Sequence, residues 1–285
     1  MTTPRRSLLF APANRPEVHA KALAAGPDIL CLDLEDAVPP SAKAEARAIA
    51  VEFLCANRSE HGAERVVRIN CLRGLEGLRD LTAILEARPA SGVVFLPKVL
   101  EVGELRLADD LIAESAPGLK LAVLIETAEG LENAFSILRG SNRIAFAMFG
   151  GVDLAADLGV AVAHEPLLYA RSRLAHAAAR AGVDLLDVPC LSFRDADAIA
   201  AEARAAKALG YTGKAALHPA GLAAIHAAFD PTEAEIAKAE VIVAAYRASP
   251  NGLATVDGKL VEKPVVRAME RILAVRHRAA PPNGT

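Results

Sequence analysis

The stretch LCLDLEDAV, residues 30–38, places three carboxylates directly after a run of apolar, β-type residues. Asp33, Glu35 and Asp36 follow a segment that must be buried if it forms a strand. Two interpretations are open. In the first, the strand ends and the acidic residues mark a solvated turn before the next helix. In the second, the carboxyl end of the strand faces a site that needs oxygen ligands or negative charge, as in α/β barrels.

The composition favours a globular protein and argues against several classes. Of the 285 residues, 53% are hydrophobic and 24% are charged, which supplies a sizeable core and gives no sign of disorder. The net charge is −3, with no Trp and only three Tyr, so the chain lacks the basic field and stacking side chains that nucleic-acid binding usually needs. No apolar run approaches the roughly 18–20 residues that span a bilayer. We therefore expect neither nucleic acid nor membrane as a partner.

The amino terminus and the cysteines favour a cytoplasmic protein. The apolar run near the start is interrupted by Pro12 and Asn14 and is too short for the hydrophobic region of a signal peptide. The four cysteines show no CxxC spacing, and three lie in apolar stretches, which predicts buried, reduced thiols rather than disulfides or zinc ligands.

Short β-type runs alternate with segments rich in Ala, Leu and Arg that are long enough for helices. Most of these runs are apolar without clean alternation, which is typical of a parallel sheet covered on both faces. An open nucleotide-binding sheet is disfavoured, because no GxGxxG turn follows the first strand and no GxxxxGK[ST] occurs. The pattern predicts an α/β fold, a (β/α)8 TIM barrel over residues 1–230. Its predicted strands are 7–13, 29–35, 65–70, 92–98, 120–126, 143–150, 183–189 and 213–219.

Residues 231–285 predict a C-terminal helical extension. The sequence DPTE begins one helix, residues 250–264 form a Gly- and charge-bearing loop, and a last helix begins near Val265. Such a loop between helices suggests a lid over its own barrel or over that of a neighbouring subunit. An ordinary pair of surface helices is the alternative.

Polar residues stand at or just after the predicted strand ends, and a barrel gathers those ends on one face. A single polar strand end would be explained by a local turn or cap. Several on one rim favour the second interpretation of residues 30–38 and predict a site there. Besides the acids of the second strand, these residues are Arg68, Lys98, Glu126, Asp153, Asp187 and His218.

Glu126 and Asp153 are predicted at the ends of neighbouring strands, about one helix plus one strand apart. Two carboxylates without a convincing Cys or His partner suit Mg²⁺ or Mn²⁺, with water and substrate oxygens completing the shell. The alternative is that each acid pairs with a rim Arg or Lys. Gly150 and Gly151 would let the backbone approach a ligand closely. We expect Asp157 to be a local cap or a partner of a ligand, not a direct ligand.

Arg68 lies between apolar residues of a strand, where an unpaired guanidinium is costly to bury. We expect Asp36 or Glu35 to pair with it in the free protein, and a substrate carboxylate or enolate oxygen to bind its fork. Lys98 could form a Schiff base, as in other barrel aldolases, but nothing nearby predicts a depressed pKa. An electrostatic role for Lys98 is favoured.

Taken together, eight short motifs resemble the citrate lyase β-subunit-like group of the HpcH/HpaI aldolase superfamily, which includes malyl-CoA and citramalyl-CoA lyases. Each motif is weak alone, but eight in the family's order are specific, and they span nearly the whole chain. They are RRSLLFAPANRPEVHAKA, LDLEDAVPPSAKAEAR, VRIN, LPKV, IETAEG, FGGVDLAADLG, GKAALHPAGLAAIHAAFDPT and DGKLVEKPVV.

The resemblance implies a Mg²⁺-dependent enzyme that makes or cleaves the carbon–carbon bond of a 3-hydroxyacyl-coenzyme A (CoA) thioester. The products of cleavage would be acetyl-CoA and glyoxylate or pyruvate. By motif, Glu126 and Asp153 are the expected metal ligands, and Arg68 is the expected substrate-binding arginine, which helps to stabilise the thioester enolate. Asp36 is then expected to assist catalysis near Arg68 and the water shell of the metal.

The resemblance also implies a homo-oligomer, trimeric or hexameric, with a lid residue supplied across subunits. Where lyases of this group commonly place an aspartate in the lid loop, this chain has Glu262, which is expected as the acid/base, with Asp257 as an alternative carboxylate. Candidates for binding the CoA phosphates, equally explained as solvated surface, are Arg5, Arg6, Arg15 and Lys21.

Two other functions stay open. One is an aldolase that acts on free 2-oxo-acid aldols without CoA. The other is a subunit that binds an acyl-CoA or organic acid but turns nothing over alone, as a citrate lyase β-chain works within a larger complex.

Overall fold

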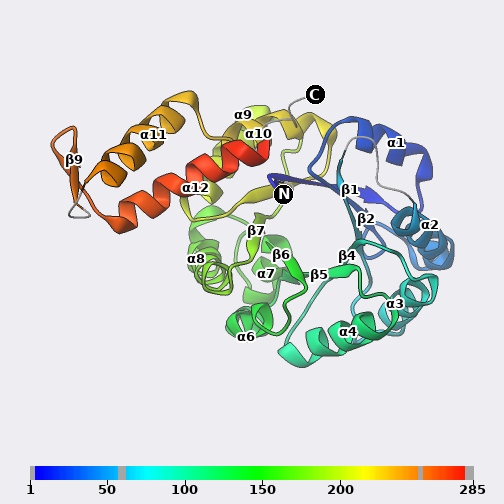
Figure 1. The fold of residues 1–285 in the computed structure, drawn as a ribbon. Helices are drawn as coiled ribbons and strands as arrows, with labels where there is room; N and C mark the ends of the chain where they lie inside the picture. Colours follow the sequence, from blue (N-terminus) through cyan, green and yellow to red (C-terminus); the bar gives the residue numbers. More distant parts are fainter. Residues whose placement is uncertain (1–3, 57–61, 250–252, 280–285) are drawn as a thin grey trace. The chain divides into compact units, whose positions relative to one another are not determined.

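The structure, a computed structural model, describes residues 4–56, 62–249 and 253–279 of the 285. Eight parallel strands close into a barrel in chain order, with β1 paired to β8 (Figure 1). All eight predicted strands are present, so the predicted (β/α)8 TIM barrel is confirmed. The strands are β1 Ser7–Pro12, β2 Ile29–Asp33, β3 Glu64–Arg68, β4 Gly92–Leu96, β5 Leu119–Ile125, β6 Ile144–Phe149, β7 Asp184–Asp187 and β8 Gly213–Ala216.

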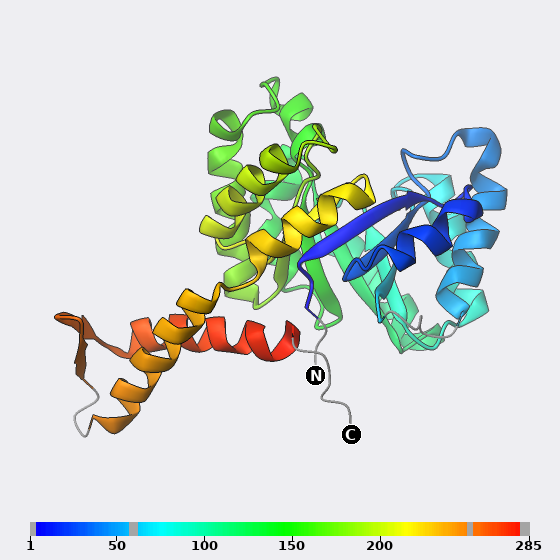
Figure 2. The same cartoon turned by 90° about the horizontal axis from the view of Figure 1, so that it is seen from above.

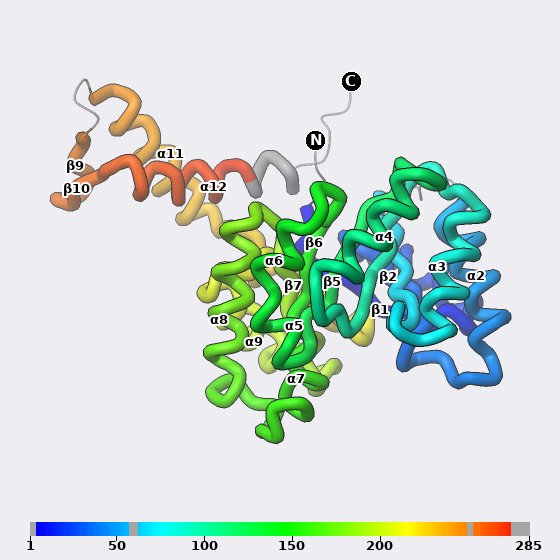
Figure 3. Tube along the Cα trace, turned by 90° about the horizontal axis from the view of Figure 1, so that it is seen from below, coloured from blue at the N-terminus to red at the C-terminus, as the bar shows by residue number. Residues whose placement is uncertain are grey.

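Helices follow each strand and cover the outside of the barrel, so that both faces of the sheet are buried and its strands are mainly apolar. Neighbouring helices pack on each other, as α2 on α3 and α3 on α4 (Figure 3). No helix in the described ranges has both the length and the apolar character to cross a bilayer. The α-helices are α1 Pro16–Ala24, α2 Lys43–Cys55, α3 Leu75–Ala87, α4 Val102–Ser115, α5 Ala128–Glu132, α6 Ala134–Leu138, α7 Gly151–Leu158, α8 His164–Ala181, α9 Ala196–Ala208 and α10 Leu222–Phe229, with 3-10 turns η1 Pro40–Ala42 and η2 Pro219–Gly221.

Apolar side chains fill the interior of the barrel. Phe95 of β4 and Phe146 of β6 are fully buried and meet edge to face, with ring centroids 5.4 Å apart. Burying side chains of this size contributes roughly 1.5–3 kcal/mol each. Because the interior is a packed core and not a pore, ligands bind at an end of the barrel. Residues of the same cluster include Leu8, Cys31, Val66, Val93, Leu124, Met148 and Leu186.

The chain forms two compact units, Arg5–His226 and a second that contains the chain from Ala227 onward. In the second, α11 (Glu233–Ala248) and α12 (Lys263–Ala279) pack on each other (Figure 2). Both predicted helices are therefore present. The boundary at residue 230 and the lid role stay predictions.

The segment predicted as a loop between these helices contains an antiparallel hairpin of β9 (Ala254–Val256) and β10 (Lys259–Val261). Asp257 and Gly258 form its turn with φ of 50° and 72°, and two left-handed residues are what a tight hairpin turn requires. The predicted start signal of α11 is a capping box, in which Thr232 and Glu235 each accept the backbone N–H of the other.

Candidate active site

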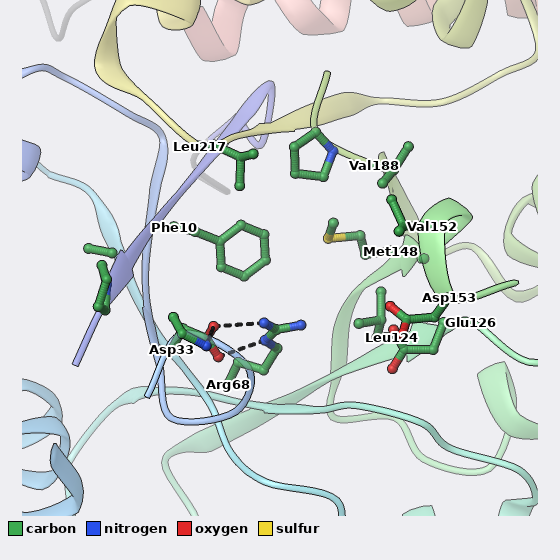
Figure 4. A pocket seen from close by; sticks show the side chains of 15 residues that line it. Phe10, Asp33, Arg68, Leu124, Glu126, Met148, Val152, Asp153, Val188 and Leu217 are labelled. Carbon is green, nitrogen blue, oxygen red and sulfur yellow. Dashed lines mark hydrogen bonds and ion pairs between the residues drawn. The ribbon is translucent and has the colours of Figure 1, made fainter. Parts of the chain in front are cut away.

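A cavity of about 300 Å³ opens at the carboxyl ends of the barrel strands. Five of the predicted site residues line it: Asp33, Arg68, Glu126, Gly150 and Asp153. Figure 4 shows the charged side chains in two groups, with Arg68 and Asp33 on one side of the cavity and Glu126 and Asp153 on the other. The structure thus brings together the predicted substrate-binding arginine and the predicted metal pair.

Arg68 is held by Asp33, whereas the sequence pattern predicted Asp36 or Glu35 as its partner. The two residues are register partners at the ends of β3 and β2. Nε and Nη2 of Arg68 donate to Oδ1 and Oδ2 of Asp33 over 2.8 and 2.7 Å, and this bidentate geometry fixes the plane of the guanidinium. The guanidinium also lies 5.1 Å from the ring centroid of Phe10. Burial would lower the pKa of Arg68, but the bond and charge of Asp33 raise it, so the group stays charged.

The three acids of residues 30–38 differ in their surroundings. Glu35 is 7% exposed, with Oε2 3.0 Å from Nη1 of Arg68 and Oε1 accepting from Nζ of Lys98 over 2.8 Å. Asp36 is 62% exposed, and its carboxylate lies 3.9 Å from the nearest nitrogens of Arg68 and Lys98, beyond hydrogen-bond distance. The predicted pairing of Arg68 is therefore present with Glu35, whereas Asp36 makes no close bond to it. A catalytic role for Asp36 stays a prediction.

Glu126 directly follows β5 and is 2% exposed. Its Oε1 accepts the backbone N–H of Lys98 over 2.8 Å. Burial, and then the charges of Glu35 and Asp153, raise the pKa of Glu126 to about 8. A carboxylate in this position carries an electrostatic cost that a cation would remove.

Asp153 lies in the first turn of α7, beside Glu126 (Figure 4). Mg²⁺ binds through one or two carboxylates and keeps sites for water and substrate oxygens, so this pair fits it. Within the described residues, no three His, Cys, Asp or Glu side chains form a metal-binding group. Two carboxylates suit a hard cation whose remaining coordination positions are filled by water and substrate oxygens, rather than a metal coordinated by protein ligands alone.

The two glycines before Asp153 are required by packing. A Cβ at Gly150 would lie 2.3 Å from the Cβ of Glu126, and a Cβ at Gly151 would lie 2.8 Å from the ring of Phe149. Gly150 lines the cavity, and Gly151 begins α7 beside it. Direct binding of substrate by the two glycines stays a prediction.

Lys98 does not have the surroundings of a Schiff-base lysine. Its Nζ donates to Glu35, as described above. Burial alone would lower the pKa of Lys98, but the hydrogen bond to Glu35 and the nearby carboxylates raise it. Schiff-base chemistry needs a depressed pKa, so these contacts fit the electrostatic role.

Other polar strand ends serve the scaffold. Asp187 at the end of β7 is buried, accepts from Nζ of the buried Lys214 over 2.8 Å and pairs with Arg171. His218 caps the 3-10 turn that follows it. Asp157 accepts the first N–H of α5 over 2.7 Å, which is the local capping role expected of it.

Arg5 and Arg6 precede β1 and so lie at the opposite end of the barrel from the cavity. Arg5 bonds Glu64 over 2.6 and 2.9 Å, and Arg6 bonds Asp28 over 2.9 and 2.8 Å. The suggestion that these two arginines hold CoA phosphates at the site is therefore wrong.

Glu262 and Asp257 belong to the C-terminal unit. Glu262 is exposed and directly precedes α12, where its carbonyl accepts the N–H of Val265 and Val266 over 2.9 and 3.1 Å. Asp257 is exposed in the hairpin turn. Their acid/base roles stay predictions.

Comparison with known proteins identifies relatives over nearly the whole chain. Residues 6–219 match the HpcH/HpaI aldolase/citrate lyase family. A citrate lyase subunit beta-like protein of Deinococcus radiodurans is 35% identical over 277 residues, which cover 94% of this chain and 96% of that protein. A (3S)-malyl-CoA thioesterase of Cereibacter sphaeroides is 34% identical over 265 residues, which cover 91% and 90%.

A solved structure is similar over the same extent. The protein CitE of Mycobacterium tuberculosis, in complex with magnesium, acetoacetate and coenzyme A, matches with a TM-score of 0.81 and 29% identity, over 96% of this chain and 98% of that one. The resemblance inferred from the eight motifs is confirmed. The chain belongs to the HpcH/HpaI aldolase/citrate lyase family and is a lyase of that family.

Proposed function

We propose that the protein is a Mg²⁺-dependent acyl-CoA lyase that cleaves a malyl-CoA or citramalyl-CoA type of thioester to acetyl-CoA and glyoxylate or pyruvate. The observation that carries the proposal is the arrangement of one cavity of about 300 Å³, with Arg68 on one side and Glu126 and Asp153 on the other. The relatives named for malyl-CoA and for a complex with magnesium and coenzyme A support it.

Glu126 and Asp153 would hold the Mg²⁺. When bound there, Mg²⁺ supplies a Lewis acid for the oxygens of a 2-oxo acid. The chain's own contribution is to keep both carboxylates in place. Gly150 packs directly against Glu126, and the backbone N–H of Lys98 binds one of its oxygens.

Arg68 would bind the negative charge that develops on the substrate. Asp33 takes two of its five N–H groups, and donors on both terminal nitrogens remain for a carboxylate or enolate oxygen. Because Asp33 fixes the guanidinium before substrate arrives, little reorganisation is needed when the bond breaks.

Apolar side chains of the cavity would exclude water. Phe10 lies over Arg68, Leu124 lies beside Glu126, and Met148 also lines the cavity (Figure 4). Charges interact more strongly where water is excluded, so this lining strengthens the hold of Arg68 and of the metal pair on a small acid.

The remaining parts of the proposal rest on the resemblance and the sequence pattern. We expect a homo-oligomer, trimeric or hexameric, in which Glu262 acts as acid/base and Asp36 assists near Arg68. Mn²⁺ is the expected substitute for Mg²⁺, and the cytoplasm is the expected compartment.

The test is an assay of the purified protein with (S)-citramalyl-CoA and with malyl-CoA, each with Mg²⁺ and with EDTA, following acetyl-CoA and the 2-oxo acid. Metal-dependent release of pyruvate or glyoxylate supports the proposal and names the substrate. Cleavage of free acids without CoA would indicate the aldolase, and binding without turnover would indicate a subunit of a larger complex. Release of malate and CoA would indicate a thioesterase, the activity for which one relative is named.

A further inference from the structure

Lys98 has a left-handed backbone conformation, with φ of 53°. The other non-glycine residues with positive φ in the described ranges are Arg88, which ends α3, and Asp257, in the hairpin turn. Left-handed residues are common in those two places. Lys98 instead stands two residues after the end of β4. A non-glycine residue keeps this conformation only where its surroundings require it, so its contacts need an explanation.

The contacts of Lys98 reach both charged groups of the site. Its backbone N–H donates to Oε1 of Glu126 over 2.8 Å, and its Nζ donates to Oε1 of Glu35 over 2.8 Å. The other oxygen of Glu35 lies 3.0 Å from Nη1 of Arg68. A continuous series of contacts therefore runs from the metal pair to the arginine through this one residue.

Neighbouring groups hold the turn itself. The carbonyl of Lys98 accepts from Nη1 of Arg73 over 2.8 Å, and Arg73 is tied to Glu104 over 2.7 Å. The carbonyl of Val99 lies so close to Gly130 that a Cβ there would be 2.4 Å from it. The left-handed turn is thus fixed from two sides by groups outside the cavity.

We propose that Lys98 is a positioning residue that sets the separation between the Glu126/Asp153 pair and Arg68. Its N–H occupies one oxygen of Glu126 and leaves the other for Mg²⁺. Its ammonium neutralises Glu35, which in turn contacts Arg68. The inference rests on the proposed function, because this separation matters only if metal and substrate oxygens bind between the two groups.

Two substitutions separate the backbone contact from the side-chain contact. Lys98→Asn removes the ammonium but keeps the N–H, in a residue type that adopts the left-handed conformation readily. Lys98→Val also removes the ammonium, and its β-branched side chain disfavours positive φ, so the N–H is expected to move away from Glu126. Arg88→Val is the matched control, because it introduces the same misfit at φ 50°, at an exposed helix end.

The readout is Mg²⁺ binding by isothermal titration calorimetry on the substrate-free proteins, with kcat/KM and melting temperature beside it. We expect Lys98→Val to weaken Mg²⁺ binding about 10-fold or more. Lys98→Asn and Arg88→Val should bind Mg²⁺ within about threefold of wild type, and both Lys98 variants should lose about 10-fold in kcat/KM.

Mg²⁺ binding by Lys98→Val equal to wild type would overturn the inference, and so would equal weakening in Lys98→Asn. If Lys98→Val does not fold, Lys98→Asn decides: near-normal Mg²⁺ binding with lowered kcat/KM supports the role, and unchanged kcat/KM overturns it. A wild-type protein that binds no Mg²⁺ would contradict the proposed function itself, which keeps the two failures distinguishable.

Discussion

The two ends of the barrel carry charged clusters that differ in how their acids are paired. At the amino ends of the strands, each acid has an arginine nitrogen within hydrogen-bond distance; this cluster consists of Arg5, Arg6, Asp28, Glu64 and Asp184. At the carboxyl ends, Arg68 and Lys98 pair with Asp33 and Glu35. Over the described part of the chain, Glu126 and Asp153 have no ion-pair partner.

The difference separates a structural end from a functional one. Paired acids at the amino ends hold the strands together, whereas a buried carboxylate without a cation costs stability and is retained where function needs it. Asp153 is exposed, so this argument applies to the buried Glu126, whose unpaired carboxylate is explained by a ligand that brings positive charge. The following experiments test this contrast, from the largest expected effect to the smallest.

Glu126→Gln keeps the shape of the side chain and removes its charge. If the unpaired acid binds the metal, kcat/KM for the CoA thioester should fall by about 10³-fold or more, because Lewis-acid stabilisation is worth several kcal/mol. Turnover with Mg²⁺ is the measurement, and circular dichroism checks the fold. A loss of kcat/KM of less than about tenfold would contradict the metal-binding role of Glu126 and remove the functional difference between the two ends of the barrel.

Arg5→Met removes one of the two arginines of the amino-end cluster and leaves the carboxylates of Glu64 and Asp184 without their ion-pair partner. Breaking a largely buried pair in this way is expected to lower the free energy of unfolding by about 3–5 kcal/mol. Urea unfolding measures it, and kcat/KM per folded enzyme should stay within about twofold of wild type. A variant of normal stability with poor turnover would show that the amino end is not merely structural.

The stability of the metal-free protein should depend on pH through Glu126. Its pKa of about 8 in the fold lies above its ordinary value of 4.5, so the fold favours the protonated acid. The resulting stability is present below pH 4.5 and is lost as the pH rises toward 8. In EDTA, Glu126→Gln should match wild type at pH 4.5 and exceed it by on the order of 2–4 kcal/mol above pH 8. If the difference in the free energy of unfolding between Glu126→Gln and wild type does not vary with pH, the raised pKa of Glu126 is contradicted.

Asp33→Asn weakens the group that orients Arg68 without touching the metal pair. We expect kcat/KM to fall about 10- to 100-fold, as for other residues that orient a binding group, with Mg²⁺ affinity within about threefold of wild type. The control is Glu45→Gln, an exposed acid of α2. If Asp33→Asn also loses Mg²⁺ binding, the two groups of the cavity are not separable.

The barrel was predictable because every strand has an apolar β-type run followed by a helical segment, and such local signals determine a regular fold. The proximity of Glu126 and Asp153 was predictable because the two are separated by about one helix and one strand, which places them at neighbouring strand ends. These predictions depend only on spacing along the chain.

Glu35 was predicted as a partner of Arg68, but the bidentate partner Asp33 was not, because three acids lie within four positions. Only the strand register, which places Asp33 opposite Arg68, identifies it. Asp187 was predicted as a site residue, but its carboxylate pairs with the buried Lys214. That pair joins two different strands, so spacing along the chain does not predict it. Contacts between distant segments decide which polar strand ends serve the site.

The strand pairing that closes the barrel, between β1 and β8 with Ser7 opposite Lys214, has a consequence for biosynthesis. The first strand emerges from the ribosome long before its last partner, and the barrel cannot close until β8 has been made. Until then β1 and the growing sheet expose unpaired edges, which are prone to wrong pairing. Arg68, Glu126 and Asp153 all precede β8 in the chain, so the ring of strands that carries the site can close only after all three residues have been made.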